Sequence, residues 1–286
     1  MAAIAEGFKE QVALLGKDSS LVAIIARPTA PQGSDRPAIV ILNTGIIHRV
    51  GHHRMYVTLS RVLAGAGHTV VRFDFSGIGD SAPAKDLMPP LAASLEQIRE
   101  VIDSLALTYH ISRFVLVGLC SGADHSILYA RNDARVVGLV LMDPTLPPTP
   151  RYYFHYVLQR LPHVRNWMSV ATGRSGLMRL LATRMSWRLR NGGNRPEELT
   201  LQSLPFSPQL AQCYRAVARR KVNMLAVFTC VSARHTYPQQ MVDAFPETST
   251  GGGLRLEYFP ESNHHFTPPQ ARARLLRVIA DWVESV

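Results

Sequence analysis

The sequence predicts an α/β fold in which a mostly parallel sheet of eight strands carries helices on both faces. Short runs of β-branched and apolar residues alternate along the chain with longer runs whose apolar residues recur every three or four positions. This alternation is typical of parallel sheets, because each return to the same edge of the sheet needs a crossing segment. With 286 residues, 47% of them hydrophobic, the chain is long enough to bury one sizeable core.

The expected elements follow each other in a regular order. The expected strands are 11–15, 21–27, 38–42, 69–73, 114–118, 136–142, 224–230 and 255–259. The first two strands flank a run of turn-forming residues, 16–20, and we expect them to pair as an antiparallel hairpin. Helices are expected at 53–66, 91–107, 122–131 and 270–285.

The segment 144–221 interrupts this rhythm and is strongly basic. It holds twelve Arg and one Lys against two Glu, whereas the rest of the chain holds 18 basic and 19 acidic residues. The net charge of +10 therefore comes from this segment. We expect a helical cap inserted after the sixth strand, with a core formed by 1–143 and 222–286, and a basic surface that suits an anionic partner. The alternative to a cap is a long connection that serves only to pack against the core. The alternative to an anionic partner is a basic face exposed to solvent.

A cysteine stands where a strand gives way abruptly to a helix. The apolar run 114–118 leads into the letters GLCSG, centred on Cys120, and a helix-like run follows. Glycines two positions before and after a central residue are typical of a nucleophile elbow, a strained turn that projects the central side chain above the sheet. The start of the following helix favours the thiolate form of Cys120. A small buried thiol is the alternative interpretation.

The order of the strands suggests partners for Cys120. The last strand leads into a polar loop with two adjacent histidines, and we favour His264 over His265 as the base, because the apolar residue after the pair is suited to anchor the loop. The stretch after the seventh strand holds no carboxylate, and Asp243 beyond it falls in a helical run. Asp143 closes the sixth strand and is our candidate for the acid. A Cys–His dyad without a carboxylate is the alternative.

Backbone amides are expected to stabilise the tetrahedral oxyanion of acyl transfer. One belongs to Ser121, next to the nucleophile, and the other to Ile46 in the loop after the third strand. Gly45 permits a tight turn in that loop, and His48 lies just beyond it. Both are candidate substrate-binding residues, as is Tyr153 in the insert. The aromatic residues around Tyr153 could line an acyl channel, and ordinary core packing is the alternative. The histidines near this loop lack the carboxylates and the spacing of a metal site, so we expect neither a metal nor a cofactor.

Three motifs resemble a known family. Residues 49–56 read RVGHHRMY, residues 71–81 read VRFDFSGIGDS and residues 118–124 read GLCSGAD. Together they are similar to the exosortase-system-associated α/β hydrolases, which also place cysteine in the elbow. The similarity covers the region from about residue 20 to residue 145 and the C-terminal histidine loop, and it is weak across the insert. It implies the α/β-hydrolase fold, a nucleophile at Cys120 and a base at His264, but supplies no substrate.

These residues together predict an acyl hydrolase or acyltransferase that forms an acyl-enzyme on Cys120. A thiolate exchanges readily with a thioester, because the entering and leaving groups are similar, and this favours a thioester over an ester. The basic insert suits the phosphates of coenzyme A or the surface of an acidic acyl carrier protein. A non-catalytic binding protein, or a lyase or isomerase on the same fold, is the alternative.

The composition argues against several other classes. The longest apolar runs are far shorter than the roughly 20 residues of a membrane-spanning helix. Residues 1–11 lack the pattern of a secretory signal, so we expect a cytoplasmic protein. The three cysteines, Cys120, Cys213 and Cys230, are too widely spaced for a disulfide framework or a zinc site. We expect a small-molecule acyl substrate and no nucleic acid.

Overall fold

The structure is a computed structural model of the chain. It describes residues 7–29, 36–84, 88–147, 149–158, 208–229, 237–251 and 253–286. The chain divides into two compact units, one formed by Met1–Pro147 with Pro205–Val286 and the other by Pro148–Leu204. The described part of the second unit contains one helix, α4 (Pro150–Leu158). Most of the predicted cap, 144–221, lies outside the described residues, so its role stays a prediction.

Eight strands of the first unit form one sheet, which confirms the predicted fold class. The strands are β1 (Phe8–Leu15), β2 (Leu21–Pro28), β3 (Ala38–Ile41), β4 (Val70–Phe73), β5 (Phe114–Leu119), β6 (Val136–Met142), β7 (Asn223–Thr229) and β8 (Leu254–Phe259). Their order across the sheet is β1-β2-β4-β3-β5-β6-β7-β8. The hairpin β1–β2 and the pair β2–β4 are antiparallel, whereas every pair from β4 to β8 is parallel.

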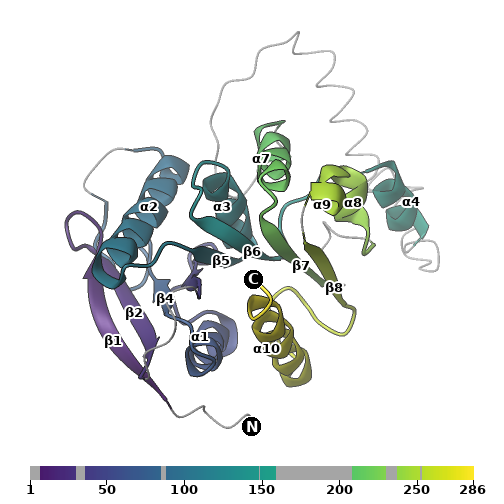
Figure 1. Ribbon diagram of the computed structural model, residues 1–286. Coiled ribbons are helices and arrows are strands. Elements are labelled where there is room, and N and C mark those ends of the chain that lie inside the picture. The colour runs from purple at the N-terminus through teal and green to yellow at the C-terminus, as the bar shows by residue number, and fades with distance from the viewer. Residues whose placement is uncertain are drawn as a thin grey trace, which may run out of the picture. The chain divides into compact units, whose positions relative to one another are not determined.

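Helices cover both faces of the sheet (Figure 1). The helices α1 (Met55–Gly65) and α10 (Pro269–Val283) lie on one face, whereas α2 (Pro90–Tyr109), α3 (Ser121–Ala130) and α7 (Pro208–Arg219) lie on the other. Short helical turns, η1 (His52–Arg54), α8 (Gln240–Ala244) and α9 (Glu247–Gly251), complete the unit. The helices at 55–65, 90–109, 121–130 and 269–283 match the four that the sequence predicts.

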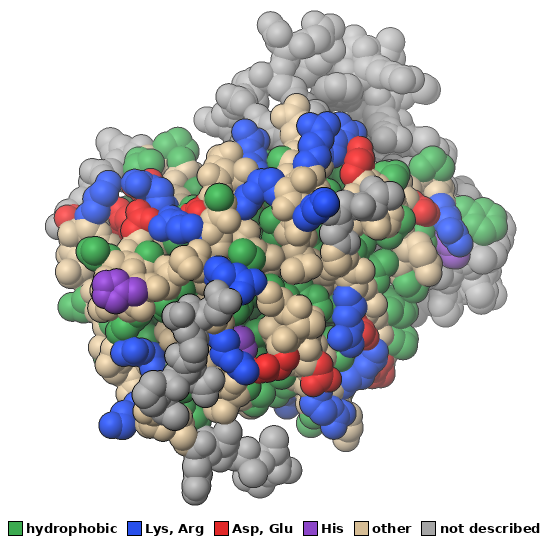
Figure 2. Space-filling view, in the orientation of Figure 1, with side chains coloured by type: hydrophobic (Ala, Val, Ile, Leu, Met, Phe, Trp, Pro, Cys, Tyr) green, Lys and Arg blue, Asp and Glu red, His purple; other side chains and the backbone are tan. Residues whose placement is uncertain are grey.

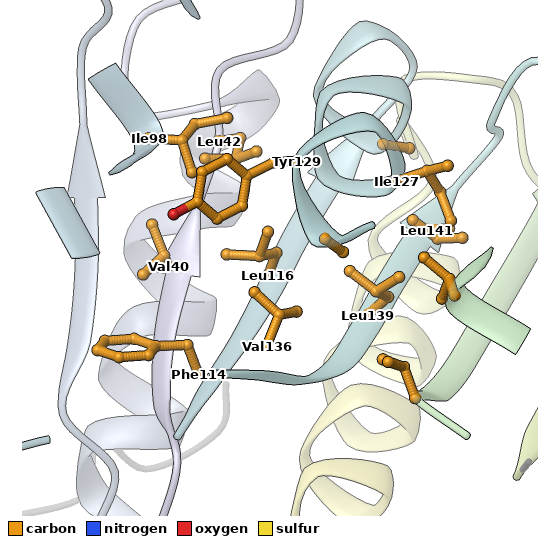
Figure 3. Close-up of a cluster of buried hydrophobic side chains, with 14 of the residues drawn as sticks. Val40, Leu42, Ile98, Phe114, Leu116, Ile127, Tyr129, Val136, Leu139 and Leu141 are labelled. Atoms are coloured by element: carbon orange, nitrogen blue, oxygen red, sulfur yellow. The ribbon is translucent and has the colours of Figure 1, made fainter. Parts of the chain in front are cut away.

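Helices bury both faces of the central strands β3, β4 and β5, whose residues are apolar apart from Arg72. Every residue of β3, β4 and β5 is buried. On the side of α2 and α3, Val40 and Leu116 pack with Ile98 and Ile127 (Figure 3). The alternate residues of the same strands pack against α1 and α10. These two cores fix the carboxyl ends of β3, β5, β6 and β7 side by side, and the residues that follow those ends form the site described below.

Charged side chains on the sheet unit are laid out as local pairs. Arg274 lies 3.1 Å from both Glu257 and Glu261, and Arg135 lies 2.7 Å from Asp133. On the face drawn in Figure 2, basic and acidic side chains adjoin one another at several places. Such pairs contribute little stability individually, but they agree with the near-neutral charge of the chain outside 144–221. None of the helices that the structure describes combines the length and the hydropathy needed to cross a membrane.

Candidate active site

Cys120 lies in a strained turn between β5 and α3. Its backbone adopts φ 56° and ψ −118°, a conformation that residues with a side chain rarely adopt. A Cβ atom on Gly118 would lie 2.1 Å from the carbonyl carbon of Gly122, and a Cβ atom on Gly122 would lie 2.6 Å from the carbonyl oxygen of Asn43. The backbone N–H of Cys120 donates to the carbonyl oxygen of Met142 at 2.9 Å. Close approach of backbone segments therefore requires both glycines of the motif.

Asp143 and His264 are hydrogen-bonded, although they lie 121 positions apart in the sequence. His264 Nδ1 is 2.8 Å from Asp143 Oδ2. The Asp143 side chain is fully buried, and its carboxylate also accepts hydrogen bonds from the backbone N–H of Thr229 at 2.8 Å and from Thr229 Oγ1 at 2.7 Å. The structure thus brings the candidate acid and the candidate base into contact at the carboxyl ends of β6 and β8.

The same contacts decide the charge of His264. The hydrogen bond to Asp143, and next the hydrogen bond to Cys120, raise the pKa of His264 to about 9, although burial acts in the opposite direction. This shift favours the imidazolium form of His264. Since Nδ1 faces Asp143, the second ring nitrogen is left for the sulfur.

The adjacent histidine, His265, belongs to a different contact. Its Nδ1 lies 3.2 Å from His52 Nε2, and the two ring centroids are 4.2 Å apart. Burial, and then the charge of His264, lower the pKa of His265. The next residue, Phe266, is fully buried and packs edge-on against Phe259 with the centroids 5.6 Å apart, as expected for an anchor of this loop. In the part of the chain that is described, no three His, Cys, Asp or Glu side chains are grouped to hold a metal ion.

The loop after β3 contacts Ser121, the residue next to Cys120. Gly45 has φ 54°, and its backbone N–H donates to Ser121 Oγ at 2.8 Å. The backbone N–H groups of Ser121 and Ile46, the two expected oxyanion donors, make no hydrogen bond to any described residue. The Ile46 side chain is 87% exposed. Two unengaged amides beside the elbow are what an oxyanion site requires before substrate arrives.

The remaining candidates lie elsewhere. His48 contacts its own loop, with Nδ1 3.4 Å from the backbone nitrogen of Val50. Tyr153 is part of α4 in the second unit, and its side chain lies outside the described residues. Asp243 lies in α8, where it accepts a hydrogen bond from the hydroxyl of Tyr237 at 2.8 Å. The roles of His48 and Tyr153 in substrate binding stay predictions.

Three residues that the sequence interpretation did not assign support the site. Thr229, the last residue of β7, gives Asp143 two hydrogen bonds. Asp124 accepts hydrogen bonds from the backbone N–H and from Oγ1 of Thr145 at 2.8 and 2.6 Å, and so joins α3 to the segment after Asp143. Tyr56 is fully buried with its hydroxyl 2.7 Å from Thr44 Oγ1, and burial raises its pKa to about 12. The sequence could have indicated only Thr229. It ends the strand next to the one that Asp143 follows, and adjacent parallel strands end at the same edge of a sheet.

Comparisons with known proteins agree on the fold. Residues 35–196, more than half of the chain, match the family described as serine aminopeptidase, S33. A hypothetical protein from Pseudomonas aeruginosa matches 99% of this chain and 94% of its own length, with 15% identity and a TM-score of 0.60. An esterase from Pyrococcus furiosus matches 97% of this chain and 91% of its own length, with 12% identity and a TM-score of 0.59. The naproxen esterase of Bacillus subtilis matches 97% of this chain and 93% of its own length, with 16% identity and a TM-score of 0.54. No curated protein sequence matches the chain.

Proposed function

Since the chain belongs to the serine aminopeptidase S33 family and is therefore an α/β hydrolase, we propose that it cleaves or transfers acyl groups through a covalent intermediate on Cys120. The observation that carries the proposal is the contact of His264 with Asp143, together with the raised pKa of His264 beside the sulfur. An imidazolium held by a buried carboxylate is the partner that a cysteine nucleophile needs. The motifs shared with exosortase-system-associated hydrolases support the same nucleophile.

The acyl transfer proceeds in balanced steps. The Cys120 thiolate attacks the carbonyl carbon, a carbon–sulfur bond forms, and the carbonyl electron pair moves to the oxygen, which accepts hydrogen bonds from the amides of Ser121 and Ile46. As the oxyanion collapses, the bond to the leaving group breaks, and the leaving group takes a proton from His264. Water then attacks the acyl-enzyme and gives a proton to His264, which releases the carboxylic acid and the thiolate.

A thioester is the substrate class that this chemistry favours. A thiolate that attacks a thioester displaces a second thiolate of similar basicity, so the first step needs little driving force. The charge of the insert points to the same class: the twelve Arg and one Lys of 144–221 suit the phosphates of coenzyme A or an acidic carrier protein. A cytoplasmic location agrees with such a substrate.

Intact-mass measurement after addition of an activated acyl thioester tests the proposal. We expect the mass of one acyl group to be added to the wild-type protein and to be absent from Cys120→Ala. The matched control is Cys213→Ala, because Cys213 is a free cysteine of α7 whose side chain is fully buried. This variant should be acylated like the wild type. An adduct that survives in Cys120→Ala, or no adduct with a range of activated acyl donors, refutes the proposal.

A further inference from the structure

The loop after β3, residues 43–50, is held by a buried carboxylate from another loop. Asp74 directly follows β4 and its side chain is fully buried. Its Oδ1 accepts a hydrogen bond from Asn43 Nδ2 at 3.1 Å and from the backbone N–H of Arg49 at 2.5 Å. The Arg49 guanidinium donates to Asp74 Oδ2 and, at 2.5 Å, to Asp80 Oδ2. One carboxylate therefore binds both the first residue of the loop and a residue near its end.

Asn43 strengthens the same connection. Its Oδ1 accepts a hydrogen bond from the backbone N–H of Phe75 at 2.9 Å, and its Nδ2 also donates to the carbonyl oxygen of Ile47 at 2.9 Å. The tip of the loop has little packing of its own: a Cβ atom on Gly45 would meet nothing within 4 Å, and the Ile46 side chain is 87% exposed. The tip is therefore held by polar contacts, which are those at its two ends together with the hydrogen bonds of Gly45 to Ser121 and of Thr44 to Tyr56.

A fully buried carboxylate is costly to desolvate, and apolar packing in its place would often be as stable, so its geometry suggests a role beyond stability. Here the fixed segment carries Gly45, whose backbone N–H meets Ser121 Oγ at 2.8 Å beside the nucleophile, and Ile46, whose backbone N–H is left for a ligand. We propose that Asp74 and Arg49 are positioning residues of the oxyanion hole, which hold the Ile46 amide opposite the Ser121 amide. The proposal rests on the acyl-transfer function proposed above.

The expected effect is specific to one kind of reaction. Oxyanion donors act only when they lie about 2.7–3.1 Å from the developing negative charge, and loss of one donor slows the reaction by roughly 10²–10³-fold. If the donor is present but loosely held, we expect a smaller decrease in the reaction rate, of roughly 10–100-fold. Alkylation of the same sulfur by iodoacetamide forms no oxyanion, so it needs the thiolate but not the loop.

The experiment compares the two reactions at Cys120 in Asp74→Asn and Arg49→Lys. We expect acylation by an activated acyl thioester to slow by roughly 10–100-fold, and alkylation by iodoacetamide to stay within about twofold of the wild type. Arg49→Lys is the milder variant, because a lysine keeps the charge but lacks the fork that joins Asp74 to Asp80. The matched control is Asp103→Asn, since Asp103 of α2 has a side chain 47% exposed, pairs with Arg135 and should be close to wild type in both reactions.

Each outcome has a distinct meaning. Unchanged acylation in both variants overturns the proposal, and so does a parallel loss of acylation and alkylation, which would indicate general damage to the fold. Thermal unfolding shows which variants fold, and if Asp74→Asn does not fold, Arg49→Lys decides the question. A wild-type protein that iodoacetamide alkylates at Cys120 but no thioester acylates would refute the acyl-transfer function itself, before any variant is compared.

Discussion

Replacement of Asp143 by Asn tests the most specific feature of the site, since it removes one charge and keeps the shape. The amide can replace either carboxylate oxygen. An NH2 group in place of Oδ1 would face the backbone N–H of Thr229, donor against donor, at a distance of 2.8 Å. The amide should therefore turn its NH2 group toward His264 and toward Thr229 Oγ1, a hydroxyl that can rotate to accept a hydrogen bond.

This orientation reverses the hydrogen bond to the base. His264 Nδ1 becomes the acceptor, so the ring proton moves to Nε2, the nitrogen that faces the sulfur. A neutral imidazole of that tautomer cannot take the thiol proton, and we expect acylation to slow by roughly 10²–10⁴-fold. Loss of hydrogen bonds to a charged group, partly offset because a neutral amide is easier to bury, should lower the free energy of unfolding by about 1–2 kcal/mol.

The assay is the rate constant for acylation of Cys120 by an activated thioester, followed by intact mass over a range of pH. The pKa of His264 should fall in Asp143→Asn, because the largest cause of its increase is the hydrogen bond to Asp143. Asp243→Asn is the control, since Asp243 bonds the Tyr237 hydroxyl and should leave acylation unchanged. Acylation of Asp143→Asn at the wild-type rate, with the wild-type pH profile, would show that Asp143 does not orient the base.

Four further predictions concern the base, the elbow and one buried histidine. Turnover should fall as pH rises through about 9, because the raised pKa of His264 means that its imidazolium loses its proton there; a basic limb near 6.5 in the pH–rate profile would contradict this. His264→Ala should slow acylation far more than His265→Ala, and the opposite order would move the role of base to His265. Gly118→Ala should lower the free energy of unfolding by at least about 3 kcal/mol in urea titrations, because its Cβ would lie 2.1 Å from a backbone carbon; Gly45→Ala, with no atom within 4 Å of its Cβ, is the milder comparison. His125→Leu should raise Tm, since both ring nitrogens are buried without a hydrogen-bond partner among the described residues and burial lowers the His125 pKa to about 4; a lower Tm would reveal a partner for His125.

The strands and the elbow could be predicted because their signals are local. Continuous apolar runs identify β3 and β5, since strands covered on both faces have no polar side. The spacing of Gly118 and Gly122 identifies the turn, since no residue with a side chain fits at either position. The pairing of Asp143 with His264 was reached from strand order alone, because parallel strands present their carboxyl ends at one edge.

The polar contacts between loops could not be predicted in this way. Asp74 accepts a hydrogen bond from the backbone N–H of Asp80 in its own segment, but Asp74 and Asp80 also both bind Arg49 from the loop after β3. Tyr56 was expected only as part of a helix, but its hydroxyl meets Thr44. Single hydrogen bonds between distant segments leave no periodic pattern in a sequence, so they emerge only when the segments are placed in space.

The position of β8 at the edge of the sheet has a consequence for how the protein acquires its reactivity. The elbow is complete once β3, β5 and β6 have assembled, but the imidazole arrives on the loop that leaves the outermost strand. The position of His264 relative to Cys120 therefore depends on how β8 and the loop after it are held. Loosening of β8 from the sheet would therefore separate His264 from Asp143 and from the sulfur without any change at the cysteine itself.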